Sequence, residues 1–453
     1  MKNVMALACI LLLGVPSVSI GSVSDDQVTS IKIKEADGTS QQDTNSGSGV
    51  KTNHIQNLAV TGAKIAGGAV TTDKIVDGAV TNAKIQDVSA AKVTGTVGNA
   101  DTVDNVHASQ FAPASHTHQY GRVAIVAKSG GDFSDPLSAV EPAAYAQWCG
   151  EPSSTNRCLL KIMPGTYDLG SSGFPMQEFA DVEGAGEDVT IITSAVDGYD
   201  VGTVVAGGGD AEMRFLTVKN TGAGQYNRAI VNSNSQNRYE HVTAMAVGAA
   251  TDCTAVFNRY NGSPVLTDVT AVASGGIDAN FGVRAWFSSV TMNGGAAIAS
   301  GGVQSVGVSI GYSSATSTIA DAVASASGAS GWNIGIDNSN STTVMKNATA
   351  SAKTGVSLTA GIYNFGNSSL TMTNVAAVAE AGATNYGVYA EVDGNLTVLD
   401  RCTVQGSPAV KGGGDGLIFK IGASKIVGGV GNGTFSCAAS YDGNYAPLDA
   451  TCH

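Results

Sequence analysis

Aromatic rings gather at matched positions in one stretch of the sequence, where charged side chains stand beside them. Seven apolar residues recur there at a nearly constant spacing, and rings occupy far more of the four positions after each of them than the 6% that they contribute to the whole chain. Rings can cover the apolar face of a pyranose while neighbouring charged groups hydrogen-bond its hydroxyls. The residues of this aromatic stripe that we expect to contact a ligand are Phe257, Arg259, Tyr260, Arg284, Trp286, Phe287, Tyr312, Tyr363, Phe365 and Tyr389.

Two other interpretations of the aromatic stripe stay open. Parallel solenoids in a trimer touch along one face, and aromatic residues are enriched in interfaces, so in a trimeric protein a subunit interface is the stronger interpretation. A register error of one residue would instead place some rings in the core, because side chains alternate between the two faces of a strand.

The spacing of the seven apolar residues indicates a stack of repeated units from about Met213 to Val404. Each repeat, roughly 26 residues long, holds short alternating strands broken by Gly, Asn and Ser rather than a helical pattern. This period predicts a parallel β-helix with one coil per repeat and about 4.8 Å between coils. The inward-facing apolar residues are Ile230, Val256, Val283, Val308, Ile336, Ile362 and Val388.

A second inward-facing position follows two residues after each apolar residue. Four of its seven members are asparagines, which predicts an internal ladder of stacked amides that satisfy backbone groups at a bend. This ladder would be structural rather than catalytic. The series reads Asn232, Asn258, Ala285, Ile310, Asn338, Asn364 and Ala390.

Two earlier segments carry a recognisable pattern. Residues 158–170 read CLLKIMPGTYDLG, and residues 180–194 read ADVEGAGEDVTIITS. The Pro-Gly pair supplies a turn, and the later glycines allow tight corners. These segments resemble the first coils of the pectin-lyase-like right-handed parallel β-helix superfamily. The resemblance covers about residues 121–430 and implies an all-β fold, but one fold of this kind hosts many functions.

The resemblance implies three sets of catalytic residues: clustered aspartates with calcium and an arginine base, an aspartate pair with arginine, or carboxylates at a fixed separation. The repeats hold none of the corresponding segments, such as Asn-Thr-Asp, Asp-Asp, Gly-His-Gly or Arg-Ile-Lys, and their aspartates are scattered along the coils. We therefore expect no catalytic residues and no cofactor. The alternative is a polysaccharide lyase or glycoside hydrolase of the tailspike or pectate-lyase type, whose carboxylates come from separate coils.

A shorter repeat precedes this region. Residues 57–98 repeat with a ten-residue period, followed by NADTVDNVHASQF at 99–111 and SHTH at 115–118. These sequences resemble the shafts and connectors of bacteriophage tail fibres and bacterial surface fibres. The resemblance implies a homotrimer, in which several chains wind together because ten residues cannot bury a layer alone. A repetitive linker without fixed structure is the alternative.

His116 and His118 would point the same way from an extended strand. In a trimer, three such pairs could bind an axial metal, because imidazole suits zinc, nickel or iron, and related fibre tips use a His-x-His pair. Two solvated histidines in a polar loop are the simpler interpretation, and the one that we favour.

Composition limits the partners. A net charge of −13 and a pI of about 4.8 argue against nucleic acid. The segment 1–21 holds one lysine, an apolar core and then small residues, which predicts a secretory signal peptide, and the apolar run is too short to span a bilayer. We therefore expect a secreted or cell-surface protein.

Six cysteines remain after the signal peptide. In an oxidising compartment, two pairs close in sequence predict disulfides, Cys149 with Cys158 and Cys437 with Cys452. Cys253 and Cys402 fall at different positions of the coil, which favours two buried thiols.

We divide the chain into a signal peptide (1–21), a flexible leader (22–56), a shaft (57–98), a connector (99–120), a β-helix (121–430) and a disulfide-stapled cap (431–453). The predicted function is that of a non-catalytic surface fibre or adhesin-like protein. Its β-helix head would bind a polysaccharide or another cell-surface polymer.

Overall fold

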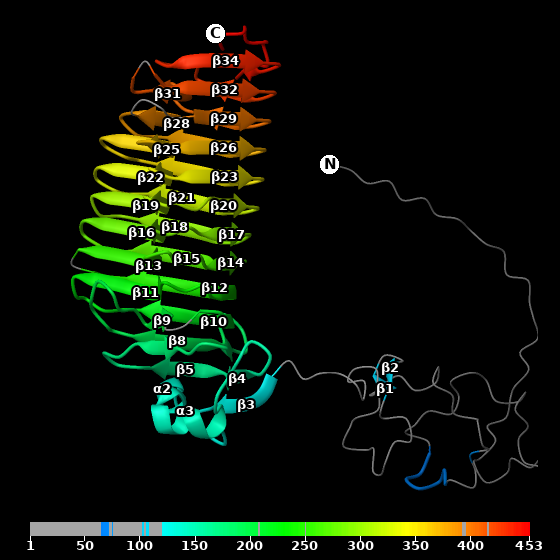
Figure 1. The fold of residues 1–453 in the computed structure, drawn as a ribbon. Coiled ribbons are helices and arrows are strands. Elements are labelled where there is room, and N and C mark those ends of the chain that lie inside the picture. Colours follow the sequence, from blue (N-terminus) through cyan, green and yellow to red (C-terminus); the bar gives the residue numbers. More distant parts are fainter. Residues whose placement is uncertain are drawn as a thin grey trace, which may run out of the picture. The chain divides into compact units, whose positions relative to one another are not determined.

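A computed structural model describes residues 65–71, 75, 102–103, 106–107, 120–206, 209–249, 251–391, 396–414 and 416–453. The chain divides into two compact units, residues 1–115 and 116–453. The larger unit is a right-handed parallel β-helix whose coils stack from its base to the C-terminus (Figure 1). The predicted fold class is therefore confirmed. In the smaller unit, β1 (Thr102–Val103) pairs antiparallel with β2 (Val106–His107).

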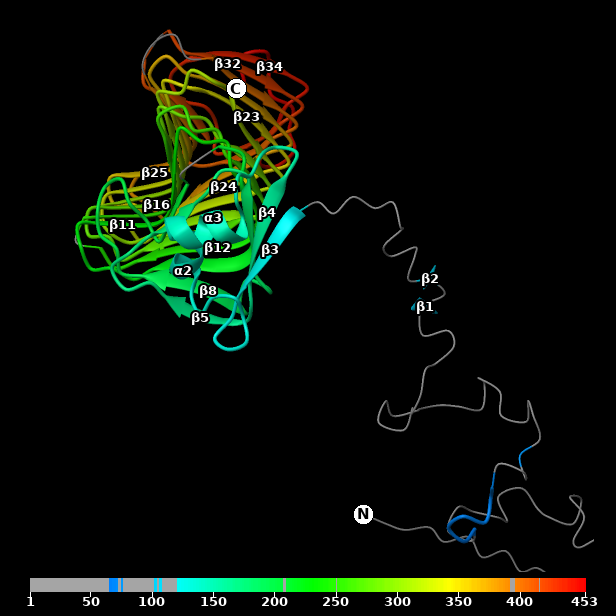
Figure 2. The ribbon, with the colours of Figure 1, turned by 60° about the horizontal axis from the view of Figure 1, so that its bottom comes forward.

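Three parallel sheets form the walls of the β-helix, and Figure 2, which brings the base of the stack forward, shows the coils one behind another. The first sheet contains β3 (Tyr120–Val126), β4 (Arg157–Ile162), β7 (Ala180–Glu183), β10 (Glu212–Asn220), β12 (Arg238–Val247), β14 (Val265–Thr267), β17 (Thr291–Asn293), β20 (Ser317–Ala320), β23 (Thr342–Lys346), β26 (Ser369–Thr373), β29 (Leu396–Asp400), β32 (Ile418–Gly422) and β34 (Thr434–Ala438). The second contains β5 (Gly165–Asp168), β8 (Thr190–Ser194), the C-terminal halves of β10 and β12, β15 (Thr270–Ser274), β18 (Ala296–Ser300), β21 (Val323–Ser327), β24 (Thr349–Lys353), β27 (Ala376–Glu380), β30 (Thr403–Gln405), β33 (Lys425–Val427) and β35 (Tyr441–Asp442). The third contains β6 (Phe174–Met176), β9 (Val204–Ala206), β11 (Tyr226–Ser233), β13 (Asp252–Arg259), β16 (Ala279–Trp286), β19 (Gln304–Gly311), β22 (Trp332–Ser339), β25 (Leu358–Phe365), β28 (Asn385–Glu391) and β31 (Val410–Gly412).

The third sheet has the register that the repeat spacing predicts. Each of the seven apolar residues pairs with the next one in the series, from Ile230 with Val256 up to Ile362 with Val388, and Val388 then pairs with Val410. All of them are fully buried in the main core. The prediction of one coil per repeat is therefore confirmed.

A small residue directly before each of these apolar residues shapes the third sheet. A Cβ atom built on Gly307 would lie 2.6 Å from the carbonyl oxygen of Gly335, so no side chain fits there. Two successive residues thus face inward, and the strand bends at this point. The residues on either side of the bend face outward and converge, and they form an apolar cluster separate from the main core that includes Phe281, Val306 and Ile334.

The asparagine ladder is present inside the third sheet. The Nδ2 atom of Asn232 donates to Oδ1 of Asn258 at 2.9 Å, and Nδ2 of Asn338 donates to Oδ1 of Asn364 at 2.7 Å. All four amides are fully buried, and Asn338 also donates to the carbonyl oxygen of Ser341. The predicted structural role is confirmed.

Two short helices cover the base of the stack (Figure 1). Helix α2 (Pro136–Val140) begins at Asp135, whose carboxylate accepts from the Ser138 amide, and α3 (Pro142–Trp148) follows directly. The indole of Trp148 donates to the Ala139 carbonyl oxygen at 2.7 Å, which ties the two helices together. Next to them, Cys149 and Cys158 form the predicted disulfide.

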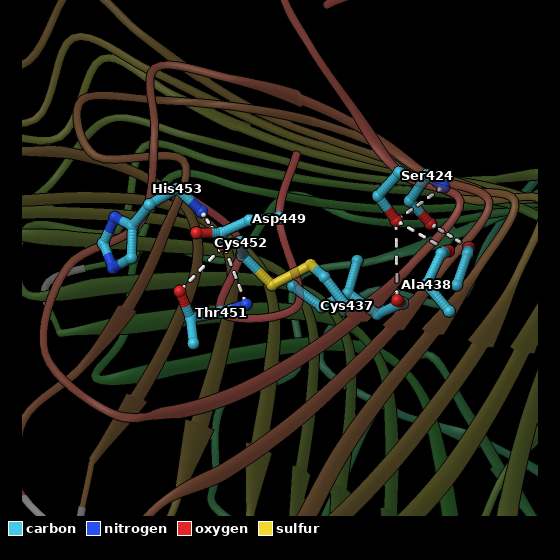
Figure 3. Close-up of a disulfide and its surroundings, with 10 residues drawn as sticks. Ser424, Cys437, Ala438, Asp449, Thr451, Cys452 and His453 are labelled. Atoms are coloured by element: carbon cyan, nitrogen blue, oxygen red, sulfur yellow. Dashed lines mark hydrogen bonds between the residues drawn. A yellow bond between two sulfur atoms is a disulfide. The ribbon is translucent and has the colours of Figure 1, made fainter. Parts of the chain in front are cut away.

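A second disulfide, between Cys437 and Cys452, closes the other end of the stack (Figure 3). Beside it, one carboxylate oxygen of Asp449 accepts from the backbone amides of Thr451 and His453, at 2.8 and 3.0 Å. These bonds fold the last residues into a turn, and the Cys437 amide donates to the Ala450 carbonyl oxygen at 3.0 Å, which holds the turn against β34. Cys253 and Cys402 are buried free thiols, as predicted.

Several predictions fall on other parts of the chain. The signal peptide, the leader and the two histidines at positions 116 and 118 lie outside the described residues, as does nearly all of the shaft. Within the part of the chain that the structure describes, no helix has the length and apolar character to cross a membrane.

Candidate functional site

A groove lies on the outer face of the third sheet, where the strands bend. It encloses about 550 Å³, a volume in the range of sites for small molecules and sugars. Strands β16 to β28 supply nearly all of its lining. The lining residues are Phe281, Arg284, Trp286, Gln304, Ser309, Tyr312, Trp332, Ile334, Asp337, Ser339, Tyr363, Phe365 and Glu391.

Small residues on two successive coils hollow out the groove. At the outward positions of β19 stand Ser309 and Gly311, where the preceding coil has Arg284 and Trp286. The next coil has Asp337 and Ser339 at these positions, and the coil after it has Tyr363 and Phe365. Large rings therefore face each other across two coils of small side chains, about 4.8 Å per coil.

Gly311 determines how Trp286 lies. A Cβ atom on Gly311 would come within 2.7 Å of two atoms of the indole ring, so the ring lies directly over this glycine. Tyr312 meets the same indole edge to face, with ring centroids 4.9 Å apart. The half-exposed Trp332 comes from the opposite end of its strand, so that rings border the groove on several sides.

The end of the groove nearest the base of the stack, formed by β16, is positively charged. The Nη1 atom of Arg284 lies 3.3 Å from Oδ2 of Asp252, and this carboxylate also binds the fully buried Arg228 at 2.8 Å. The Arg284 guanidinium stacks on the Phe281 and Trp286 rings, 4.3 and 5.1 Å from their centroids. Burial lowers the pKa of Arg284, although Asp252 opposes this effect.

A carboxyl group lies two coils above Arg284. One oxygen of Asp337 accepts from the Ser339 hydroxyl at 2.7 Å, and the other accepts from Ser309 at 3.0 Å. Burial raises the pKa of Asp337, and the two hydroxyl groups only partly offset this. A partly desolvated carboxyl of this kind is a candidate for binding or proton transfer.

The other end of the groove, formed by β25 and β28, combines aromatic rings with a second carboxyl group, that of Glu391. The Tyr363 hydroxyl donates to Oε2 of Glu391 at 2.5 Å, and its ring stacks with those of Phe365 and Tyr389 at 5.8 and 5.5 Å. Burial, with the nearby Glu391 carboxylate, raises the pKa of Tyr363, so this hydroxyl stays protonated and remains a donor. The upper wall is therefore an apolar stack with one fixed polar edge.

An exposed ridge of rings runs along the corner beside the groove. Tyr260, Phe287 and Tyr312 are 48, 49 and 45% exposed, and they follow one another on successive coils. Each has a positive φ, of 50°, 53° and 54°, a conformation that is unusual for a bulky residue. The coils before and after place Asn234 and Asn340 in the same conformation.

The structure brings most of the aromatic stripe onto this face but corrects part of it. Phe257 is fully buried, because Tyr199 packs against it edge to face at 5.6 Å and guanidinium groups stack on it. Arg259 is buried in an ion pair with Asp200. These two residues face outward as predicted, but they are covered and do not line the groove. Tyr389 packs behind Tyr363 and is also absent from the lining.

Eight lining residues were absent from the predicted set: Phe281, Gln304, Ser309, Trp332, Ile334, Asp337, Ser339 and Glu391. Four of them, Ser309, Asp337, Ser339 and Glu391, lie after the apolar residues but are not rings, and the prediction selected mainly rings. The other four lie in the first halves of their strands, two or four residues before the apolar residues, whereas the prediction considered only the positions after them.

Comparisons with known proteins gave matches among solved structures only. No family model matches the chain, and neither does any curated protein. The A-module of mannuronan C-5 epimerase AlgE4 from Azotobacter vinelandii is 14% identical, with 71% of this chain and 98% of that chain covered and a TM-score of 0.43. Dettilon tailspike protein is 12% identical over 76% of this chain and 71% of its own, with a TM-score of 0.37.

Pectate lyase Pel9A is 12% identical over 70% of this chain and 78% of its own, with a TM-score of 0.35. The fold assignment itself comes from the strand register of this chain, in which each repeat adds one coil to three parallel sheets. The chain therefore has the fold of a right-handed parallel β-helix.

Proposed function

We propose that this protein is a secreted surface protein whose β-helix binds a polysaccharide in the groove of the third sheet. The observation that carries the proposal is the hollow itself: rings of Trp286 and Tyr363 face each other across a polar floor formed by Ser309, Asp337 and Ser339. Rings suit the apolar faces of pyranoses, and the floor offers hydrogen bonds to their hydroxyl groups.

Retention on immobilised polysaccharides tests this proposal. The protein is expected to bind at least one neutral or charged polymer of a broad panel, and Gly311→Ala is expected to weaken that binding because the new methyl group displaces the Trp286 ring. Gly209→Ala is the matched control, since a Cβ atom there meets nothing within 4 Å. Loss of retention in Gly311→Ala alone would support the groove, whereas equal binding by both variants would contradict it.

A second candidate function is cleavage of the bound polymer. Asp337 favours it, because burial raises the pKa of this carboxyl and a general acid needs such a shift, and Glu391 supplies a second carboxylate in the same lining. New reducing or unsaturated ends, lost in both Asp337→Asn and Glu391→Gln, would support the enzyme. Binding without any new ends would support the non-catalytic protein.

Features outside the groove support secretion and a trimeric assembly. The predicted signal peptide favours a location outside the cell, and the fibre-like repeats at 57–98 favour a homotrimer that presents three β-helices. The two disulfides suit an oxidising compartment.

A further inference from the structure

Charges of opposite sign stand on one wall and on the floor of the groove. Arg284 lies on β16 and Asp337 on β22, with only the β19 coil and its Ser309 between them. Adjacent coils are about 4.8 Å apart, so the two backbones are separated by roughly 10 Å. A ligand inside the hollow therefore has a cation at one end and a carboxyl group beneath it.

Both groups retain capacity to bind a ligand. The Arg284 side chain lines the groove and is 18% exposed, and its ion pair with Asp252 uses only Nη1, so part of the guanidinium faces the groove. Asp337 accepts from two serine hydroxyls, and no described cation lies within ion-pair distance of it. Its carboxylate can therefore still accept hydrogen bonds from a ligand.

This arrangement disfavours a polymer that carries one charge on every residue. A uronate chain would bring a second carboxylate against Asp337 in a partly desolvated site, where the two groups cannot both stay ionised without a large electrostatic cost and one of them must otherwise take up a proton. A cationic chain would meet Arg284 in the same way. A neutral sugar avoids both penalties, because its hydroxyl groups accept from Arg284 and donate to Asp337.

We infer that the groove is selective for uncharged glycans, and that Asp337 is the residue that excludes acidic ones. This inference rests on the proposed polysaccharide binding. The net charge of −13 supports it, since it opposes the approach of polyanions at low ionic strength.

Matched polymers test the inference. We would measure affinity for neutral glucan, mannan and galactan and for the same polymers after oxidation of their C6 alcohols to carboxylates, a change that adds charge but leaves the linkages intact. At least one neutral polymer is expected to bind about tenfold more tightly than its oxidised form at low salt, which corresponds to one charge-assisted contact.

The variant Asp337→Asn is expected to weaken binding of the neutral polymer about tenfold and to narrow the difference between the two forms. Asp268→Asn is the control, because this exposed carboxylate follows a strand of the first sheet and has a positive φ that asparagine tolerates.

The outcomes distinguish a failure of the proposed polysaccharide binding from a failure of the proposed selectivity for uncharged glycans. If no polymer of either form binds, the proposed polysaccharide binding fails and this inference fails with it. If an oxidised polymer binds as tightly as its neutral parent, or if Asp337→Asn leaves the preference unchanged, the selectivity is wrong while polysaccharide binding stands. The comparison of neutral and oxidised polymers on the unaltered protein does not depend on the folding of any variant.

Discussion

At the scale of single residues, the groove is a place where side chains take costly environments. Three bulky residues of the ridge have left-handed backbone conformations that Asn or Gly adopts elsewhere in the same column. Asp337 is a carboxyl group whose pKa is raised by burial. The same left-handed conformation recurs at other corners of the coils, as at Phe215, His241 and Asp268, so the positive φ belongs to the fold, and the cost lies in placing a bulky ring there.

Phe287→Asn tests this interpretation. Asparagine tolerates the positive φ, so relief of strain is expected to raise the free energy of unfolding by about 1 kcal/mol. The lost ring is expected to weaken polysaccharide binding at the same time. Chemical denaturation and retention assays measure both effects. A variant that is less stable than the parent protein would show that the ring contributes more to folding than its conformation costs.

Asp337→Asn is expected to change stability with a defined pH dependence. Because burial raises the pKa of Asp337 in the folded state, its charged form destabilises the fold at every pH above that value. The neutral amide removes this cost, so the variant is expected to gain stability near pH 7. The gain is expected to shrink as pH falls through the folded-state pKa and to vanish below the unfolded value of about 3.9.

Thermal melts of both proteins between pH 3 and pH 8 check this expectation. A gain that stays constant over the whole range would contradict the burial of this charge. A loss of stability at pH 7 would show that the hydrogen bonds from Ser309 and Ser339 outweigh the cost of desolvation.

At the scale of elements, the repeated strand with its internal amide is the unit that positions the site. Asn338→Ala removes the donor to Asn364 and the acceptor of the fully buried Thr343 hydroxyl, which is expected to cost about 2 kcal/mol. Asn374→Gly is the control, because its amide donates to Asn347 on an exposed corner with positive φ. Urea unfolding of the two variants compares the costs, and similar values would contradict the importance of the internal ladder.

The elements also show what the sequence could predict. The pairing of Val283 with Val308, and of Val308 with Ile336, follows directly from the repeat spacing, because each coil adds one strand to the same sheet. Inward and outward positions then follow from alternation along the strand.

The site was harder to predict because it depends on two features that alternation does not contain. The bend at Gly307 adds outward residues such as Trp332 to the same surface, although they stand before the expected positions. The segment that holds Tyr199 covers Phe257, and the repeat pattern contains no signal that this segment packs against the outer face of the third sheet. Burial of that ring could therefore be known only from the folded chain.

At the scale of the whole molecule, a stack of coils is stabilised between neighbours and is vulnerable at its ends. The Cys437–Cys452 disulfide, with a sequence separation of 15, is expected to contribute about 3 kcal/mol by limiting the unfolded chain. Replacing both cysteines by alanine is expected to lower the melting temperature and to speed proteolysis at the C-terminal coils (Figure 3). Mass spectrometry of the first cleavage products locates the effect, and initial cleavage in the central coils would contradict it.

The oligomeric state decides between a binding face and a subunit interface for the aromatic stripe. Light scattering of the mature chain is expected to give a trimer. If Trp286→Ala and Phe287→Asn both leave the trimer intact, the ridge and groove are available to a ligand. Dissociation to monomers in either variant would show that this face holds subunits together.

The most direct test of polysaccharide binding uses the three tryptophans of the chain as reporters. Trp286 and Trp332 line the groove, whereas Trp148 lies in the helix at the base. In a titration with the retained polymer, the fluorescence change is predicted to persist in Trp148→Phe and to disappear when Trp286 and Trp332 are both replaced by phenylalanine. A change that is lost with Trp148 and kept without the other two would contradict binding in the groove.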